Sequence, residues 1–281
     1  MITLSSKTLA QRIHARTATE VAMLSSRGID TQLAVVLVGD NSASRTYVAI
    51  KEKRAKEVGI SFSTYYLPES VLMTALTDTI SFLDADKDVH GLLLQLPLPK
   101  VFRVEALLSL VSKNKDVDGL TGGWISTVQP NVSNSMEGFY SQPILYPPIV
   151  EGVLSLLSEY NISFLKSKIV IVGNGRLVGV PLFSYFSALE CDVTVVTEDT
   201  PHITSVTQQA DILICGTGQS ELVTYQWIKP GATVIDCAHD IHFDSVSQVA
   251  GALAPSVGGI GPLTVAWLLN NTVRAALEVH G

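Results

Sequence analysis

Short apolar runs rich in β-branched residues recur along the chain, and helical patterns lie between them. A continuous apolar run of this length is typical of a strand that is covered on both faces. Strands that alternate with helices at this spacing indicate a parallel sheet, so the sequence predicts an α/β fold. The strands are expected at LAVVLVG (33–39), ISFSTYYL (60–67), GLLLQLPLP (91–99), KIVIVG (168–173), DVTVV (192–196), DILICG (211–216) and ATVIDC (232–237).

The helices are placed by their capping residues as well as by their periodicity. Asn41 and Ser42 are expected to cap a helix over about 43–58, and Gly59 is expected to end it. Pro262 is expected at or near the first turn of the final helix. Further helices are predicted at about 6–27, 71–84, 149–160 and from 178 onward.

A loop-rich zone at about 112–146 separates two stretches of this α/β pattern. Scattered Pro, Asn and Ser residues interrupt both periodicities there, so we expect a domain boundary in the zone. A cleft between two α/β units is a usual place for a ligand.

Composition narrows the class of protein. The formal net charge is −7, which argues against a nucleic-acid binder, because such proteins need a basic face. No apolar run reaches the roughly 20 residues of a membrane span, and the N-terminus lacks the apolar core of a targeting segment. The three cysteines, Cys191, Cys215 and Cys237, form no CxxC pair, so we expect reduced, buried thiols and a cytoplasmic protein.

A glycine turn follows the strand at 168–173. It contains Gly173, Gly175 and Gly179 and opens a helix. Such glycines let backbone N–H groups approach a pyrophosphate, although the last spacing is one residue longer than in the usual dinucleotide motif. A tight turn without a ligand is the alternative. An acid after the next strand, Glu198 or Asp199, could bond a ribose hydroxyl or repel the extra phosphate of NADP.

Four stretches, taken together and in order, resemble the methylenetetrahydrofolate dehydrogenase/cyclohydrolase family. The similarity runs nearly from end to end of the chain. The first stretch centres on a Tyr-x-x-x-Lys helix, and the last resembles the family's Pro-Gly-Gly-Val-Gly-Pro-Met-Thr signature. They are LAVVLVGDNSASRTYVAIKEKRAKEVGI (33–60), HGLLLQLPLP (90–99), KDVDG (115–119) and VGGIGPLTVAWLLNNT (257–272).

The resemblance implies a fold and two reactions. A folate-binding catalytic domain would span 1–146 and be completed by the last helix, 262–281, while 147–261 would form a Rossmann domain. The reactions are NAD(P)-dependent oxidation of methylenetetrahydrofolate and hydrolysis of the methenyl product to formyltetrahydrofolate, within one-carbon metabolism and purine biosynthesis. The resemblance favours NADP, with NAD as the alternative, and a homodimer.

The resemblance also assigns roles on the folate side. Lys51 would activate the attacking water, Tyr47 would stack on the folate, and Gln95 would orient the lysine. Asp118 would accept two hydrogen bonds from the pterin, and Ser44, in the turn before the helix, would line the site. Taken singly, these residues have ordinary explanations, since a Tyr-x-x-x-Lys pair is common on solvated helix faces.

Two further groups follow from the same resemblance. Glycines ahead of the last helix would allow close approach of a flat ligand, so the substrate side also includes Gly258, Gly259 and Pro262. The cofactor side comprises Gly173, Asn174, Gly175, Arg176, Gly179, Thr197 and Glu198.

Departures from the family pattern cluster on the cofactor side. They lie at 120–127, 147–150, 174–176 and 197–198, and Val257 replaces a proline. Three alternatives to the bifunctional enzyme therefore stay open: a cyclohydrolase without dehydrogenase activity, a non-catalytic folate-binding paralogue, and another dehydrogenase that shares only the Rossmann half.

One cluster of potential metal ligands, DCAHDIHFD (236–244), contains His239, Asp240, His242 and Asp244. A metal site would need these side chains to converge on one point. The strand before it resembles a Rossmann strand at which the family has no metal, so we expect a solvated loop and no metal.

Overall fold

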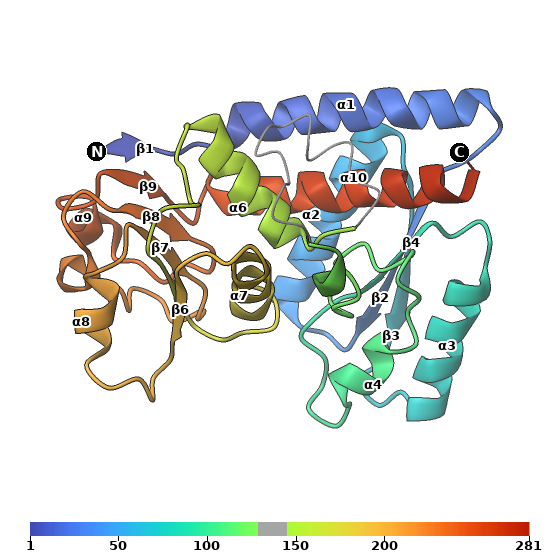
Figure 1. The fold of residues 1–281 in the computed structure, drawn as a ribbon. Coiled ribbons are helices and arrows are strands. Elements are labelled where there is room, and N and C mark those ends of the chain that lie inside the picture. The colour runs from blue at the N-terminus through green and yellow to red at the C-terminus, as the bar shows by residue number, and fades with distance from the viewer. Residues whose placement is uncertain (129–144, 281) are drawn as a thin grey trace. The chain divides into compact units, whose positions relative to one another are not determined.

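The computed structural model describes residues 1–128 and 145–280 and forms two compact α/β units (Figure 1). Unit 1 contains Met1–Gln11, Ile149–Thr264 and a segment that starts at Ile125. Unit 2 contains Arg12–Trp124, the chain from Val265 onward and a short segment that ends at Pro148. Residues 129–144 of the predicted loop-rich zone lie outside the described residues.

Unit 2 is built on a three-stranded parallel sheet in the order β3-β2-β4. The strands are β2 (Gln32–Val38), β3 (Ser61–Leu67) and β4 (Gly91–Leu94). Alternate residues of β2 enter two different apolar clusters, with Val35 in one and Val36 in the other. The central strand is therefore covered on both faces, as its continuous apolar run predicts.

The helices that cover this sheet follow the predicted segments closely. In α2 (Ser42–Val58), the Asn41 side chain accepts a hydrogen bond from the Ser44 N–H, and Gly59 ends the helix at φ 85°. Asn41 is thereby confirmed as the cap and Gly59 as the stop, whereas Ser42 is the first residue of the helix and not a cap. The other helices with residues in unit 2 are α1 (Lys7–Ser26), α3 (Met73–Ala85), α4 (Val104–Leu108) and α10 (Ile260–His280).

The structure of unit 2 differs from the sequence prediction at β4 and at α4. Strand β4 ends at Leu94 and does not continue to residue 99, because Pro97 and Pro99 have no N–H with which to extend a ladder. The short helix α4 was not predicted, because five residues are too few to show a helical period.

Unit 1 is a six-stranded parallel sheet in the order β1-β9-β8-β7-β5-β6. The chain passes from β5 to β6 on one side and then to β7 on the other side of β5. The strand order therefore reverses at β5, and ligands of such sheets bind where this happens, beyond the carboxyl ends of the strands. The strands are β1 (Ile2–Thr3), β5 (Ile169–Val172), β6 (Val193–Val196), β7 (Ile212–Cys215), β8 (Thr233–Asp236) and β9 (Ala252–Ala254).

The two longer helices of unit 1, α6 (Pro148–Glu159) and α7 (Gly179–Ala188), lie where the sequence predicts them. Strands β1 and β9 and four short elements were not predicted, because two to five residues carry no period. Those four are α8 (Ile203–Thr207), α9 (Phe243–Val246) and the 3₁₀ turns η1 (Ile125–Thr127) and η2 (Tyr225–Trp227).

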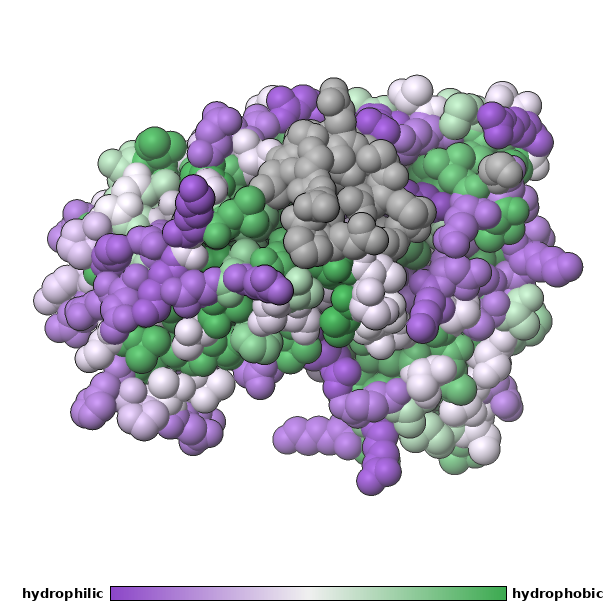
Figure 2. Space-filling view, viewed as in Figure 1, coloured by the Kyte–Doolittle hydropathy of each residue, from purple (hydrophilic) through white to green (hydrophobic). Residues whose placement is uncertain are grey.

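Hydrophilic and hydrophobic residues are interspersed on the face shown in Figure 2. Among residues 1–128 and 145–280, no helix has both the length and the apolar character to cross a membrane. All three cysteines are free, but only Cys215 is fully buried, so the expectation of burial is wrong for Cys191 and Cys237, which are partly exposed.

Candidate active site

Lys51 is the centre of a polar group within unit 2. It lies in the middle of α2, and its Nζ donates a hydrogen bond to Gln95 Oε1 at 2.9 Å. Burial lowers the pKa of the Lys51 amine, while the nearby Asp118 carboxylate acts to raise it. The amine is thus largely withdrawn from bulk water and has one neutral and one anionic neighbour.

Gln95 is held in place by the end of β4. Its backbone N–H donates to the Val36 carbonyl, which carries the strand pairing one residue beyond Leu94. Its side-chain Nε2 donates to the Leu96 carbonyl at 2.7 Å. With the amide N–H group engaged in this way, the Oε1 atom is left to face Lys51.

Asp118 follows Val117 in the segment after α4, two residues beyond Asp116, which forms a parallel bridge with Leu92 of β4. Burial raises the pKa of Asp118, the Lys51 cation lowers it, and the Asp116 carboxylate raises it. Each charge in the Lys51–Asp118 pair therefore partly offsets the cost of burying the other.

Tyr47 and Ser44 lie on α2 on the N-terminal side of Lys51. Tyr47 precedes it by one helical turn, and the residue is 58% exposed, so its side chain is accessible to a ligand. Ser44 is buried, and its N–H is bonded to Asn41 Oδ1. The expectation that Ser44 lies in the turn before the helix is wrong, because the Asn41 cap already starts α2 at Ser42.

Asp116 is a second carboxylate in this region that the sequence did not single out. It is 5% exposed, and its oxygens accept the N–H groups of Leu120 at 3.2 Å and Thr121 at 2.8 Å. Burial raises the pKa of Asp116, and these hydrogen bonds lower it. The residues that donate hydrogen bonds to Asp116 are close to it in sequence, so Asp116 could have been identified from the KDVDG motif.

The glycine turn of unit 1 connects β5 to α7. Gly173 has φ 100°, and its N–H donates to the Val196 carbonyl of β6. A Cβ on Gly179 would lie 2.1 Å from the Gly173 oxygen, so the helix can start this close to the strand only without a side chain. The turn lies at the carboxyl edge of β5, where the strand order reverses, and this is where a pyrophosphate would bind.

The other predicted cofactor residues lie on the same edge of the unit 1 sheet. Asn174 and Gly175 are exposed, and Arg176 is partly exposed. Because Val172 pairs with Val196, Thr197 and Glu198 follow the neighbouring strand end directly. The Thr197 N–H donates to Thr200 Oγ1 at 2.9 Å, and Glu198 is exposed.

The predicted residues ahead of the last helix also belong to unit 1. Gly258 has φ 80°, and its carbonyl accepts hydrogen bonds from the Ser6 N–H and Oγ. A Cβ on Gly259 would lie 2.0 Å from the Pro255 oxygen, and Pro262 is exposed in the first turn of α10. Of the predicted site residues, Lys51, Gln95 and Asp118 lie close together in unit 2.

The cluster at 236–244 differs from its prediction. Asp240 is fully buried, and its carboxylate accepts hydrogen bonds from Thr217 N, Thr217 Oγ1 and Gln219 N, so the solvated-loop expectation is wrong for it. His242 instead caps α9 by accepting the Ser245 N–H. No group of three or more potential metal ligands converges within the described part of the chain.

Unit 1 is a parallel α/β unit with a glycine turn of the kind that binds phosphate, and unit 2 holds a buried lysine beside a carboxylate. Together these features define a class of nucleotide-dependent α/β enzyme. Family models narrow this class. The tetrahydrofolate dehydrogenase/cyclohydrolase catalytic domain matches residues 4–118, and the NAD(P)-binding domain of the same family matches residues 147–280. The chain therefore belongs to the tetrahydrofolate dehydrogenase/cyclohydrolase family, which confirms the resemblance and the predicted fold class.

Individual relatives agree with this assignment along the whole chain. The bifunctional protein FolD of Geobacillus thermodenitrificans is 38% identical, with 98% of this chain and 97% of that protein covered. The bifunctional enzyme FolD from Campylobacter jejuni has a similar structure, with a TM-score of 0.88, 33% identity and 99% coverage of both chains. The Trypanosoma brucei FolD, solved with an NADP cofactor and an inhibitor, also has a TM-score of 0.88, at 27% identity and with 99% of this chain and 98% of that chain covered.

Proposed function

We propose that the chain is a bifunctional folate enzyme of one-carbon metabolism. It oxidises 5,10-methylenetetrahydrofolate to 5,10-methenyltetrahydrofolate with a nicotinamide cofactor and hydrolyses the product to 10-formyltetrahydrofolate. The observation that carries the proposal is the bond between Lys51 and Gln95 beside Asp118. The names of the curated relatives support it, because they describe bifunctional proteins over nearly the same length.

In the hydrolytic step, Lys51 is the base. Its burial lowers the pKa of the amine and so increases the neutral fraction at physiological pH. Water adds to the methenyl carbon, and its proton passes to Lys51 Nζ while Gln95 Oε1 holds the amine. The Lys51 ammonium then gives this proton to N5 as the bond from that carbon to N5 breaks. The hydroxyl proton of the adduct passes to bulk water as its oxygen becomes the carbonyl of the formyl group on N10.

Folate binding is assigned to residues around this base. Asp118 accepts two N–H groups of the pterin, a charge-assisted contact that favours the ionised carboxylate. The exposed ring of Tyr47 stacks on the folate. Ser44, Gly258, Gly259 and Pro262 complete the proposed substrate side.

The glycine turn fits a dinucleotide, because the missing side chain of Gly179 lets α7 start close to the end of β5, and Asn174 and Gly175 are exposed at the strand-order reversal. The bound cofactor supplies the hydride acceptor for the oxidation. The residues proposed to hold its phosphates and ribose are Gly173, Asn174, Gly175, Arg176, Gly179, Thr197 and Glu198. We propose NADP as the cofactor, with NAD as the alternative that the exposed Glu198 favours.

Two spectrophotometric assays test the function. Purified protein should form methenyltetrahydrofolate from the methylene compound with NADP or NAD, and it should hydrolyse methenyltetrahydrofolate faster than buffer does. Hydrolysis without oxidation would show that the protein has only the cyclohydrolase activity. The departures from the family pattern at Asn174 and Thr197–Glu198 make this the second candidate function. Binding of folate without either activity would indicate a non-catalytic paralogue.

Assembly and location are part of the proposal. We propose a homodimer, since β6 is an edge strand and Val180 and Phe183 of α7 expose apolar side chains in the same unit. Light scattering at micromolar concentration tests this, and a monomer mass would reject it. The three free thiols favour the cytoplasm. We propose domain limits of 1–146 with 262–281, and 147–261.

A further inference from the structure

We propose that Asn271 of α10 is a positioning residue for the folate site, because its side-chain amide holds the backbone segment that presents Asp118. This inference rests on the proposed function, since it concerns how Asp118 meets its substrate. Asn271 is separated from Val117 by 154 positions and was not singled out in the sequence.

The Asn271 amide joins two backbone segments. Its Nδ2 donates to the Val117 carbonyl at 3.0 Å and to the Tyr146 carbonyl at 2.8 Å. Its Oδ1 accepts a hydrogen bond from Arg274 Nη1 at 3.1 Å. The side chain is fully buried, so both donors of the NH₂ group are used away from water.

The bond to the Val117 carbonyl acts directly on Asp118. That carbonyl belongs to the same rigid peptide unit as the Asp118 N–H. When Asn271 fixes the plane of this unit, it limits rotation about the Asp118 backbone and therefore the direction in which the carboxylate points. Apolar packing of the Val117 side chain alone would not set the plane of the following peptide.

The chain on the other side of Asp118 is also fixed. The Gly119 N–H donates to the Asp116 carbonyl, and Trp124 Nε1 donates to the Gly119 carbonyl at 2.8 Å. A Cβ on Gly119 would lie 2.7 Å from the backbone nitrogen of Pro147, the residue after Tyr146. Asp118 thus stands between two anchored residues, and Asn271 supplies the anchor on the N-terminal side.

The packing around Val117 leaves little room for compensation. A Cβ on Gly91 of β4 would lie 2.9 Å from Val117 Cγ1 and 3.1 Å from Thr272 Oγ1 of α10. Strand, turn and helix are therefore in close contact at this point. Loss of the Asn271 amide would leave two buried carbonyls without these donors, and the turn would shift to find others.

A shift of Asp118 has a second measurable consequence at Lys51. The Asp118 carboxylate raises the pKa of Lys51 against the effect of burial. If Asp118 moves away, this opposition weakens and the pKa of Lys51 falls further. Because Lys51 acts as a base, the rise of hydrolytic activity with pH should then occur at lower pH.

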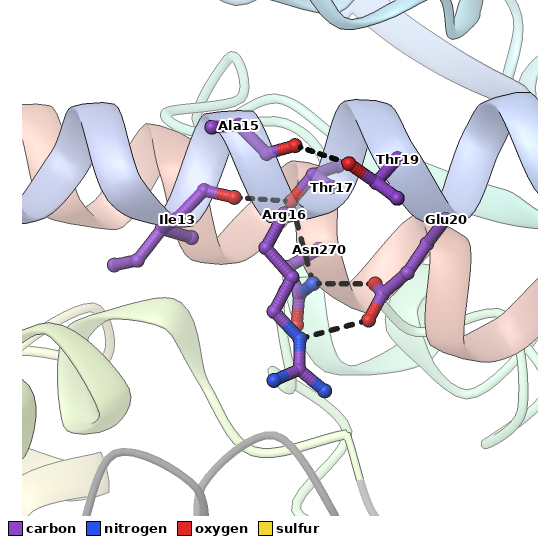
Figure 3. Close-up of polar contacts among 7 residues, drawn as sticks. All are labelled: Ile13, Ala15, Arg16, Thr17, Thr19, Glu20 and Asn270. Atoms are coloured by element: carbon purple, nitrogen blue, oxygen red, sulfur yellow. Dashed lines mark hydrogen bonds and ion pairs between the residues drawn. The ribbon is translucent and has the colours of Figure 1, made fainter.

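The neighbouring residue provides a matched control. Asn270 is 1% exposed on the same helix, and its Nδ2 donates to Thr17 Oγ1 and Glu20 Oε2 of α1, each at 3.3 Å. Figure 3 shows this group, with Arg16 bound to the same Glu20 carboxylate. A substitution at Asn270 therefore disturbs buried polar contacts of α10 without removing the bond to Val117.

The test compares Asn271→Leu and Asn271→Ser with Asn270→Leu and Asn270→Ser in the full chain. Leucine keeps the branching of asparagine at Cγ without its hydrogen-bonding atoms but is larger, and serine is a smaller polar replacement if the leucine variant does not fold. For each folded variant, KM and kcat for folate and for the dinucleotide are measured, with the pH–rate profile of methenyl hydrolysis and the melting temperature.

Substitution of Asn271 should raise the KM for folate about tenfold in both assays. It should leave the KM for the dinucleotide unchanged and move the hydrolytic profile to lower pH. Asn270 variants should lose melting temperature but keep the wild-type folate KM and profile. Equal folate KM values and profiles in the two series would overturn the inference, as would an unfolded pair at position 271. An inactive wild-type protein would instead reject the proposed function.

Discussion

At the scale of single residues, two opposing effects act on the Lys51 amine. Burial lowers the pKa of this amine, and the Asp118 carboxylate raises it. Gln95 Oε1 accepts a hydrogen bond from the amine, which has an N–H to donate in both its neutral and its charged form. A lysine at the surface would stay protonated at neutral pH, with a pKa of about 10.4. The site therefore depends on keeping this amine out of bulk water.

Replacement of Lys51 by alanine should remove the base but leave the folate contacts of Asp118 and Tyr47. We expect methenyl hydrolysis to fall roughly 10²- to 10⁴-fold, the usual contribution of general acid–base catalysis. Folate binding, measured by fluorescence quenching, should persist. Lys53→Ala, an exposed lysine on the same helix, is the control and should retain wild-type turnover. Undiminished hydrolysis in Lys51→Ala would contradict the assignment.

Replacement of Asp118 by asparagine should remove the charge that raises the pKa of Lys51. The pKa of Lys51 then falls, and the limb of the pH–rate profile on which hydrolysis rises with pH should move to lower pH. The measurement is kcat at saturating folate, corrected for the buffer reaction. A limb that stays in place, or moves to higher pH, would show that Asp118 does not act on the base.

How far the sequence predicts this site depends on how close the partners are along the chain. Tyr47 and Lys51 are separated by one helical turn, so their common face follows from the period. Gln95 and Asp118 were predicted from their motifs, although no local pattern shows that Gln95 reaches Lys51, 44 residues away. The contact of Asn271 with Val117 had no local signal at all, because it depends on how a distant helix packs.

At the scale of elements, α2 fixes where Lys51 lies. Asn41 starts the helix and Gly59 stops it, and both could be predicted because caps depend on residue type and position alone. The length of β4 could not be predicted from its apolar pattern. The prolines after Leu94 end the ladder although the apolar residues continue.

Replacement of Gly59 by alanine should destabilise unit 2 by more than replacement of Gly28 does. Both glycines have positive φ, 85° and 80°, so each alanine carries a left-handed backbone cost of roughly 1–2 kcal/mol. At Gly59 the new Cβ would also lie 3.2 Å from Val21 Cγ1, whereas nothing lies within 4 Å at Gly28. Urea unfolding of both variants measures the difference. Equal losses would show that the helix end adjusts freely around Val21.

At the scale of the whole molecule, the parallel sheets were predictable and the order of their strands was not. The β-branched runs predict parallel strands, but they do not say which strands are neighbours. Strand β1 pairs with β9, so that Ile2 is opposite Ala252. Two residues carry no period, and a pairing across most of the chain leaves no trace in local sequence.

Stability as a function of pH combines buried groups from several elements. His90 is one of these groups. Its Nδ1 accepts a hydrogen bond from the Gln32 N–H at 3.2 Å, and its Nε2 lies 3.1 Å from His280 Nε2. Burial lowers the pKa of His90, and His280 and Lys115 lower it further, while Asp88 and Asp30 act to raise it.

The folded state therefore binds a proton at His90 less readily than the unfolded chain, whose histidine has a pKa of about 6.5. The stabilising contribution of neutral His90 is complete above that value and is lost as the pH falls below it. Asp116 and Asp118 act in the opposite direction at lower pH, because burial raises the pKa of both in the folded state. The contribution of His90 must therefore be isolated by comparing variants.

His90→Gln should have a flatter dependence of unfolding free energy on pH than the wild type between about pH 7 and 5. Urea unfolding at half-unit steps measures both slopes, and the difference between them isolates His90 from the carboxylates, which both proteins share. The wild type should lose more stability than the variant as the pH falls. If the two curves stay parallel, protonation of His90 does not change the free energy of unfolding, and the short contact with His280 persists when one ring is charged.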